Sequence, residues 1–241
     1  MVASIFGTIV GLGGAFVVVP VLRIFFGVPP AEAAGTSLAM VLANTAAAAV
    51  GYMRQKMIDV RFAIPFTVGA VPGSILGVLA VKRFSPSGFD LAYGIQLIFL
   101  AALVIRRRSV ASRPAGERTW AHDPRVGVIA GVGVGLFSSM FGIGGGAIMI
   151  PLLLVAARMP PHVVVATSAF VITTTSPVGV VAHALGHDID WVFALPLIAG
   201  GLVGGSLGPP LARRIASPVL ITLLAGALIL AAISLALRHI F

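Results

Sequence analysis

The sequence predicts an all-α polytopic membrane protein made of two homologous four-segment repeats, with about eight membrane segments and glycine-broken first and fifth helices. Composition is the first reason: 59% of the 241 residues are hydrophobic, only 10% are charged, and the mean hydropathy is +1.10. Soluble domains carry about 25% charged residues, so a water-soluble fold is excluded. The second reason is a duplication, because the glycine and proline pattern that ends at Pro20 recurs at Pro151, a shift of 131 residues.

The duplication extends along most of the chain. The same shift pairs Pro29 with Pro160, Thr36 with Thr167, Asp59 with Asp190, Gly69 with Gly200 and Arg83 with Arg214. Matching glycine and proline interruptions in two apolar halves are typical of secondary transporters, whose sites form where broken helices meet. We therefore divide the chain into a first membrane repeat (1–105), a basic cytoplasmic linker (106–124) and a second membrane repeat (125–241).

Each repeat contains four apolar runs, and about 20 residues suffice to span a bilayer. All eight are predicted to be helical, because an open sheet edge finds no hydrogen-bond partner in lipid. Asp59 and Asp190 directly precede the third run of their repeats and are predicted N-caps. The predicted segments are 2–26, 31–52, 60–81 and 89–105 in the first repeat, and 126–157, 161–185, 191–212 and 218–237 in the second.

The basic residues indicate the orientation, because Lys and Arg concentrate on the cytoplasmic side of membrane proteins. If all eight segments cross, the side that holds the linker carries ten of the 16 Lys and Arg residues; if the first and fifth segments turn back at their glycines, it carries twelve. The second count favours inverted halves. Both counts place the linker in the cytoplasm.

The first candidate site consists of glycines that interrupt the first and fifth segments. A helix broken inside the membrane exposes amide N–H groups, and the half-helix that begins there directs its positive dipole end at the gap, which suits an anion. The alternative is that these glycines only allow close helix packing. Neither cluster is followed by the Lys and Ser or Thr of a nucleotide loop. The glycines are Gly11, Gly13 and Gly14, and Gly142, Gly144 and Gly145.

The second candidate set lies on the segments that follow the breaks. A seven-residue step returns to nearly the same helix face, so Ser37 aligns with Asn44, and Ser168 with Thr175. Hydroxyls in membrane helices often bond only to their own backbone, but Asn44 needs a partner outside its helix or a wet cavity. Together with the breaks these side chains would form an uncharged pocket of hydrogen-bond donors. The set is Thr36, Ser37 and Asn44, with Thr167, Ser168, Thr174 and Thr175.

Several other function classes are excluded or disfavoured. Cysteine is absent, which excludes disulfides and thiolate chemistry, and no basic stripe interleaved with aromatics indicates nucleic-acid binding. The spacing of His183 and His187 would suit a metal, but Gly186 lies between them and a solvated loop is the simpler interpretation. Ser168 and His183 are about 22 Å apart along one helix and cannot form a hydrolytic pair. We predict no enzyme activity, no cofactor and no metal site.

The doubled pattern Gly-Leu-Gly-Gly-Ala-Phe-Val-Val-Val-Pro and Phe-Gly-Ile-Gly-Gly-Gly-Ala-Ile-Met-Ile-Pro, each followed by Pro-Pro and Thr-Ser, resembles the TauE/SafE sulfite exporter family, also called the toluene sulfonate uptake permease family. The resemblance covers essentially the whole chain. It implies a multi-pass transporter of the bacterial or archaeal inner (plasma) membrane, built by duplication and associated with sulfite and organosulfonates. The motif positions that match are Gly11, Gly13, Gly14, Pro20, Thr36 and Ser37, with Gly142, Gly144, Gly145, Pro151, Thr167 and Ser168.

The resulting expectation is a secondary transporter of a small anion, sulfite or an organosulfonate, with the lipid bilayer as its surroundings. Export is the direction that the resemblance implies, and uptake stays open because the family also includes it. Two alternatives remain open: a carrier of a different small substrate, and a membrane assembly or interaction protein that transports nothing. The sequence gives no indication of the oligomeric state or of a coupling ion.

Overall fold

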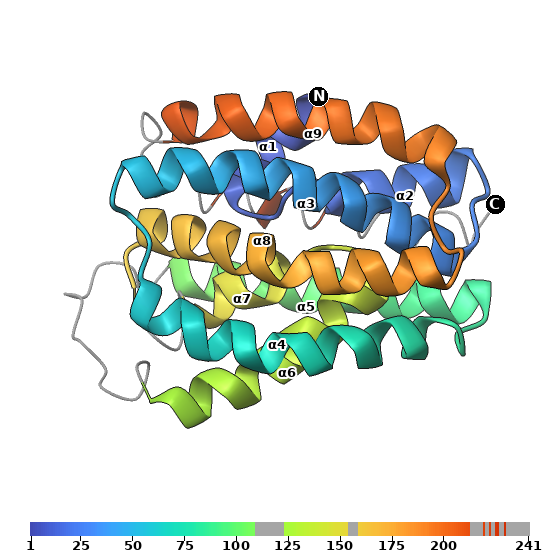
Figure 1. Cartoon of the computed structure of the whole chain (residues 1–241), viewed down its shortest axis with the longest axis horizontal. Helices are drawn as coiled ribbons and strands as arrows, with labels where there is room; N and C mark the ends of the chain where they lie inside the picture. The colour runs from blue at the N-terminus through green and yellow to red at the C-terminus, as the bar shows by residue number, and fades with distance from the viewer. Residues whose placement is uncertain are drawn as a thin grey trace.

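The computed structural model of the chain describes residues 1–108, 123–153 and 159–212, with the single positions Val219, Thr222, Ala225, Gly226 and Ile229. Within these residues the regular structure is helical, and no strand occurs. The helices form one bundle whose long members run roughly along a common axis (Figure 1).

The helices follow the predicted segments closely. The first predicted segment is two helices, α1 and α2, and the fifth is α6 and α7, each pair separated by its glycines. Most of the predicted eighth segment and most of the linker lie outside the described residues, although α5 continues through the first three arginines assigned to the linker. The bounds are α1 Val2–Val10, α2 Ala15–Phe25, α3 Pro30–Arg54, α4 Val60–Val81, α5 Pro86–Arg108, α6 Pro124–Phe141, α7 Gly146–Leu152, α8 Pro161–Leu185 and α9 Trp191–Ala212.

Five helices in the described part of the chain are long and apolar enough to cross a membrane. They are α3, α4, α6, α8 and α9, with the α8 span taken from His162. The outer helices keep large apolar side chains exposed, among them Ile64 and Val68 on α4 and Val192 and Leu195 on α9. An apolar outer surface of this kind suits lipid rather than water.

Both glycine-broken segments turn back instead of continuing straight. The rings of Phe6 on α1 and Phe16 on α2 have centroids 6.1 Å apart, whereas ten residues of straight helix span about 15 Å. In the second segment, a methyl group on Gly145 would lie 2.8 Å from the side chain of Val134 on α6. Each break therefore forms a hairpin, of the short helices α1 and α2 in the first half and of the longer α6 with the short α7 in the second.

The helices of the two sequence halves are interleaved. α4 packs along α6, and α9 packs along α1. Glycines make both approaches close: a methyl group on Gly73 of α4 would collide with the carbonyl of Val132, and one on Gly204 of α9 would collide with the Ser4 side chain. At the centre α3 and α8 pack together and run in opposite directions. The outer helices α4 and α9, on opposite sides of the bundle, also run in opposite directions (Figure 1).

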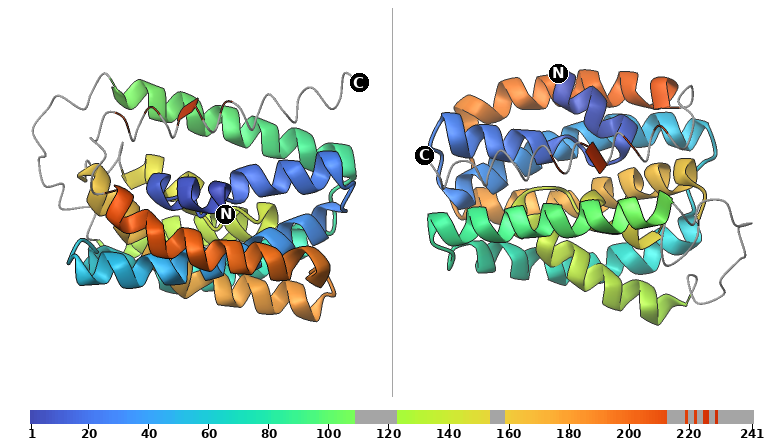
Figure 2. Two further views of the ribbon diagram at one scale, coloured as in Figure 1. Left: turned by 90° about the horizontal axis from the view of Figure 1, so that it is seen from above. Right: turned by 180° about the vertical axis from the view of Figure 1, so that it is seen from behind.

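Figure 2 shows the same bundle from above and from behind; seen from above, α1 and α2 (blue) lie between α5 (green) and α9 (orange-red). The first hairpin thus occupies the interior of the bundle, whereas α6, the long arm of the second, lies at its edge with Ile129 and Phe137 exposed (Figure 1).

Candidate functional site

The glycine clusters adopt a backbone that other residues rarely tolerate. Gly11, Gly13 and Gly14 have φ of 83°, 69° and 90°, and Gly142, Gly144 and Gly145 have φ of 69°, 79° and 80°. Positive φ is freely accessible to glycine and strained for residues with a Cβ atom. The two predicted breaks thus share one conformation, position for position.

The two breaks lie against each other in the protein interior. A methyl group on Gly146 would collide with the carbonyl oxygen of Gly11. The side chain of Val41 on α3 touches both breaks, because a methyl group on Gly13 or on Gly144 would run into it. Residues 131 positions apart in the sequence therefore meet at one place.

Two serines connect each central helix to the hairpin of the opposite half. The Ser37 hydroxyl on α3 donates to the carbonyl of Gly142 at 3.0 Å, and the Ser168 hydroxyl on α8 donates to the carbonyl of Gly11 at 3.4 Å. Both serines are fully buried. Each also donates to a carbonyl in its own helix, that of Ala34 or Val165, so each hydroxyl proton is shared between two acceptors.

The neighbouring threonines have a different role. The hydroxyl oxygen of Thr36 accepts from the backbone N–H of Asp190, and that of Thr167 accepts from the N–H of Asp59, both at 2.9 Å. The Asp59 carboxylate in turn accepts from Phe62 N–H as the predicted N-cap of α4. Thr36 and Thr167 therefore hold the corners that begin α9 and α4.

Asn44 has partners outside its own helix, as predicted. Its amide donates to the Ser4 carbonyl at 2.9 Å, and its oxygen accepts from the Thr8 hydroxyl, both on α1. The seven-residue alignment does not bring Ser37 and Asn44 to a common partner, because Ser37 reaches the other hairpin.

The hydroxyls of the two remaining threonines form their hydrogen bonds with residues outside the breaks. Thr175 donates to the Val171 carbonyl of its own helix. This is the bonding to its own backbone that hydroxyls in membrane helices often show, rather than a role in a polar pocket. Thr174 is exposed, and its hydroxyl lies 3.0 Å from that of Thr67 on α4.

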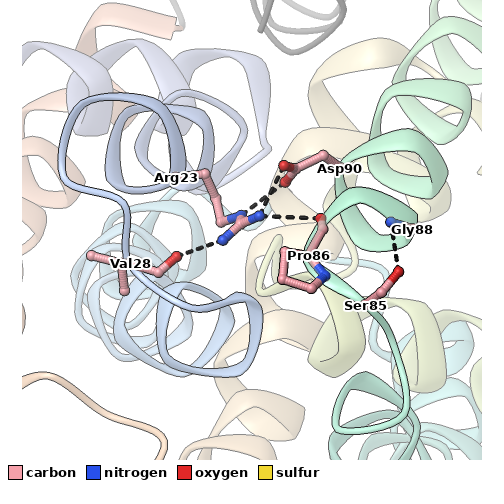
Figure 3. Close-up of polar contacts among 6 residues, drawn as sticks. All are labelled: Arg23, Val28, Ser85, Pro86, Gly88 and Asp90. Carbon is pink, nitrogen blue, oxygen red and sulfur yellow. Dashed lines mark hydrogen bonds and ion pairs between the residues drawn. The ribbon is translucent and has the colours of Figure 1, made fainter. Parts of the chain in front are cut away.

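Sequence reasoning missed a buried ion pair, shown in Figure 3. The guanidinium of Arg23 on α2 donates through Nε and Nη2 to the two carboxylate oxygens of Asp90 on α5, each at 2.8 Å. It also donates to the carbonyls of Val28 and Pro86. Asp90 lies at the very start of the predicted segment 89–105, and the shift of 131 places apolar Leu154 and Ile221 at the positions that correspond to Arg23 and Asp90, so no repeated pattern indicated this pair.

His183 is also buried rather than in a solvated loop. Its Nε2 lies 3.0 Å from the carbonyl of Ser139 on α6, while His187 at the helix end is exposed. Among residues 1–108, 123–153 and 159–212, no group of three or more His, Asp or Glu side chains could hold a metal ion.

Comparison with known proteins decides the family. The profile described as Sulfite exporter TauE/SafE matches residues 1–235. The chain belongs to the TauE/SafE family. It is 31% identical to "Probable membrane transporter protein YunE" of Bacillus subtilis, over 100% of this chain and 96% of that protein.

Other TauE/SafE relatives are more distant or shorter in overlap. A "Probable membrane transporter protein" of Xylella fastidiosa is 30% identical over 86% of this chain and 79% of its own length. "Sulfite exporter TauE/SafE family protein 3" of Arabidopsis thaliana is 32% identical over 60% of this chain and 32% of its own length. No solved structure matches the chain. This TauE/SafE protein is a membrane transporter and a multi-pass protein of the plasma membrane.

Proposed function

We propose that this transporter exports a small anion, sulfite or an organosulfonate, and binds it where the two glycine breaks meet. One observation supports this most strongly: two breaks with the same unusual backbone lie against each other inside the bundle, with a buried serine hydroxyl at each. Broken helices that meet between two repeats are where secondary transporters bind their substrates.

The proposed ligands are backbone amides of the breaks, at Gly14 and at Gly142, Gly144 and Gly145, with the hydroxyls of Ser37 and Ser168. The N–H groups of Gly11 and Gly13 already donate to the carbonyls of Thr8 and Gly7, so these two glycines shape the turn. The first amides of a helix have no acceptor within that helix, so the start of α2 offers N–H donors to an oxyanion. The set carries no fixed charge, which suits an anion that has to be released again.

The serine bonds suggest how binding is linked to movement. Each hydroxyl proton is donated to a carbonyl of the opposite hairpin. A sulfonate or sulfite oxygen is a better acceptor than a carbonyl because it is charged. On this proposal, anion binding draws the hydroxyl away from Gly142 or Gly11 and frees that hairpin from the central helix. Thr36, Thr167 and Asn44 then position the helices around the site.

We further propose that the chain forms eight membrane segments in two inverted halves. The hairpins give each half an odd number of crossings, and the opposite directions of α3 and α8 fit this arrangement (Figure 1). Twelve of the 16 basic residues then share the linker side, as expected for a cytoplasmic face. Exchange of contacts between inverted halves gives alternating access to the two sides of the membrane.

Flux measurements in proteoliposomes test the substrate. Purified protein is reconstituted, and entry of radiolabelled sulfite and methanesulfonate is followed under an imposed potential, which contributes about 2.3 kcal/mol per charge per 100 mV. We expect saturable flux of at least one of the two, blocked by the other and not by chloride. Folded protein that moves neither anion would contradict the proposed substrate class, and protein-free liposomes provide the background.

A further inference from the structure

A second polar cluster lies at the end of the bundle opposite the linker, apart from the proposed anion site. It consists of His183 near the end of α8, Asp188 in the corner between α8 and α9, and Lys82 at the end of α4. The His183 ring is fully buried. Its Nδ1 lies 3.7 Å from Oδ2 of Asp188, which forms an ion pair of 2.9 Å with Nζ of Lys82.

The hydrogen bond at the other ring nitrogen fixes the tautomer of His183. Nε2 lies 3.0 Å from the carbonyl oxygen of Ser139, and a carbonyl only accepts. Nε2 therefore carries a hydrogen. In the neutral ring Nδ1 then has only its lone pair, and this buried atom has no hydrogen-bond partner. It faces a carboxylate oxygen, so two acceptors oppose each other and leave a position for a proton between them.

The charges around the ring come from two elements. Asp188 belongs to the corner and Lys82 to α4, while α6 contributes the uncharged Ser139 carbonyl and α3 packs Gly35 against the His183 Cβ atom. The side chains of Lys82 and Asp188 are 41% and 13% exposed. Water at this end of the bundle therefore reaches part of the Asp188 side chain, although the Oδ2 atom that faces Nδ1 is itself buried.

The equivalent position in the first half does not titrate near neutral pH. Tyr52 lies 131 positions before His183, and its hydroxyl donates to the carbonyl of Thr8 at 3.3 Å. Thr8 lies 131 positions before Ser139. The same contact, from a central helix to the helix that precedes a glycine break, is thus made by a phenol at the linker end and by an imidazole at the opposite end.

We propose that Nδ1 of His183 and Oδ2 of Asp188 form a proton-binding site that fills from the side opposite the linker and strengthens anion binding at the neighbouring break. The effect on anion binding rests on the proposed function. A proton from water bonds to Nδ1 and donates to Asp188. The cluster then changes from net zero to net +1, and Ser139 is only three residues, about 4.5 Å along the axis, from Gly142. Because coupling is reciprocal, anion binding favours protonation equally.

Histidine NMR tests the proton site without any substrate. Protein labelled with ¹⁵N-histidine is titrated from about pH 8 to pH 5, where imidazoles ionise, and the His183 signals are assigned by their loss in His183→Gln. We expect the Nε2–H tautomer at high pH and an imidazolium at low pH. Lys82→Gln, at an exposed position, should shift this ionisation to higher pH by removing a competing cation. An Nδ1–H tautomer, or a titration unaffected by Lys82→Gln, would overturn the site.

Binding of methanesulfonate, which stays ionised over this range, tests the coupling. We expect its affinity in the wild type and in the exposed control His187→Gln to rise about fivefold or more from pH 8 to pH 5. In His183→Gln, whose amide can still donate to Ser139, the affinity should not change with pH. Wild-type binding that is independent of pH overturns the coupling alone, whereas no binding to any variant contradicts the proposed function and leaves the NMR result standing.

Discussion

Arg23 and Asp90 are separated by 67 positions in the sequence, yet their side chains form an ion pair through two hydrogen bonds. Each side chain is only 3% exposed. The pair joins α2, the second arm of the first hairpin, to α5. The ring of Phe89 lies 5.8 Å from the guanidinium carbon. This hairpin is therefore tied to α5 at the end of α2, away from the break.

Removing one member of this pair should destabilise the protein strongly. Asp90→Asn leaves the Arg23 charge buried without its counterion, and the free energy of unfolding should fall by about 3 to 5 kcal/mol. Thermal unfolding in detergent measures the loss. The double variant Arg23→Met with Asp90→Leu removes both charges and should be more stable than Asp90→Asn. A single variant as stable as the wild type would contradict this role of the pair.

The hydroxyls of Thr36 and Thr167, which hold the corners before α9 and α4, should each contribute to stability. Thr36→Val and Thr167→Val remove the oxygen that accepts from Asp190 N–H or Asp59 N–H, and each should lower the free energy of unfolding by about 1 to 3 kcal/mol. Unfolding in mixed detergent micelles measures this. Thr36→Ser keeps the oxygen and serves as the control, so a serine variant as unstable as the valine variant would point to packing instead.

The serines should affect binding more than folding. Ser37→Ala and Ser168→Ala leave a hairpin carbonyl without one donor, which buried carbonyls tolerate better than amides do. Loss of a hydrogen bond to a charged ligand costs about 1.5 kcal/mol, so the affinity for sulfite or sulfonate should fall about tenfold. Binding titrations at equal folded yield measure this. Thr173→Ala is the control, since that hydroxyl bonds within its own helix; equal losses in all three variants would argue against the site.

Two glycines on one helix should differ sharply in their tolerance of alanine. A methyl group on Gly131 of α6 would collide with the carbonyl of Phe66 on α4, whereas one on Gly133 meets nothing within 4 Å. Gly131→Ala should reduce the yield of folded protein, and Gly133→Ala should stabilise α6 slightly, by up to about 1 kcal/mol. Size-exclusion profiles and melting temperatures compare them; equal behaviour would contradict the close α4 and α6 contact.

The glycine breaks and the segment pattern could be predicted because they depend on local chemistry. Glycines at Gly11 and Gly142 interrupt apolar runs, and the sequence alone shows that a helix is weak there. The charge count even favoured hairpins over straight crossings. The direction in which each hairpin turns, and its contact with the other break through Val41, depend on tertiary packing that no local pattern encodes.

The partners of the polar side chains could not be predicted for the same reason. The sequence correctly indicated that Asn44 needs a partner on another helix, but not that this helix is α1. Thr36 and Ser37 are adjacent, yet one holds a helix corner and the other reaches a hairpin, because neighbouring residues on a helix point in directions about 100° apart. His183 looked like part of a loop because polar residues follow it, whereas the corner folds over Gly35 and buries it.

The hydrogen bonds that Thr167 and Thr36 accept from Asp59 and Asp190 each join one half of the chain to the other, and this affects how the protein is made. Thr167, which completes the start of α4, is synthesised more than a hundred residues after Asp59, and the α4 helix finds its close partner α6 only when the second half emerges. During translation, α4 of the first half is therefore made before α6 and Thr167, the partners that it contacts in the finished protein. Neither half is a folding unit by itself, and a gene cut in two at the linker would be expected to produce a working protein only when both pieces are made in the same cell.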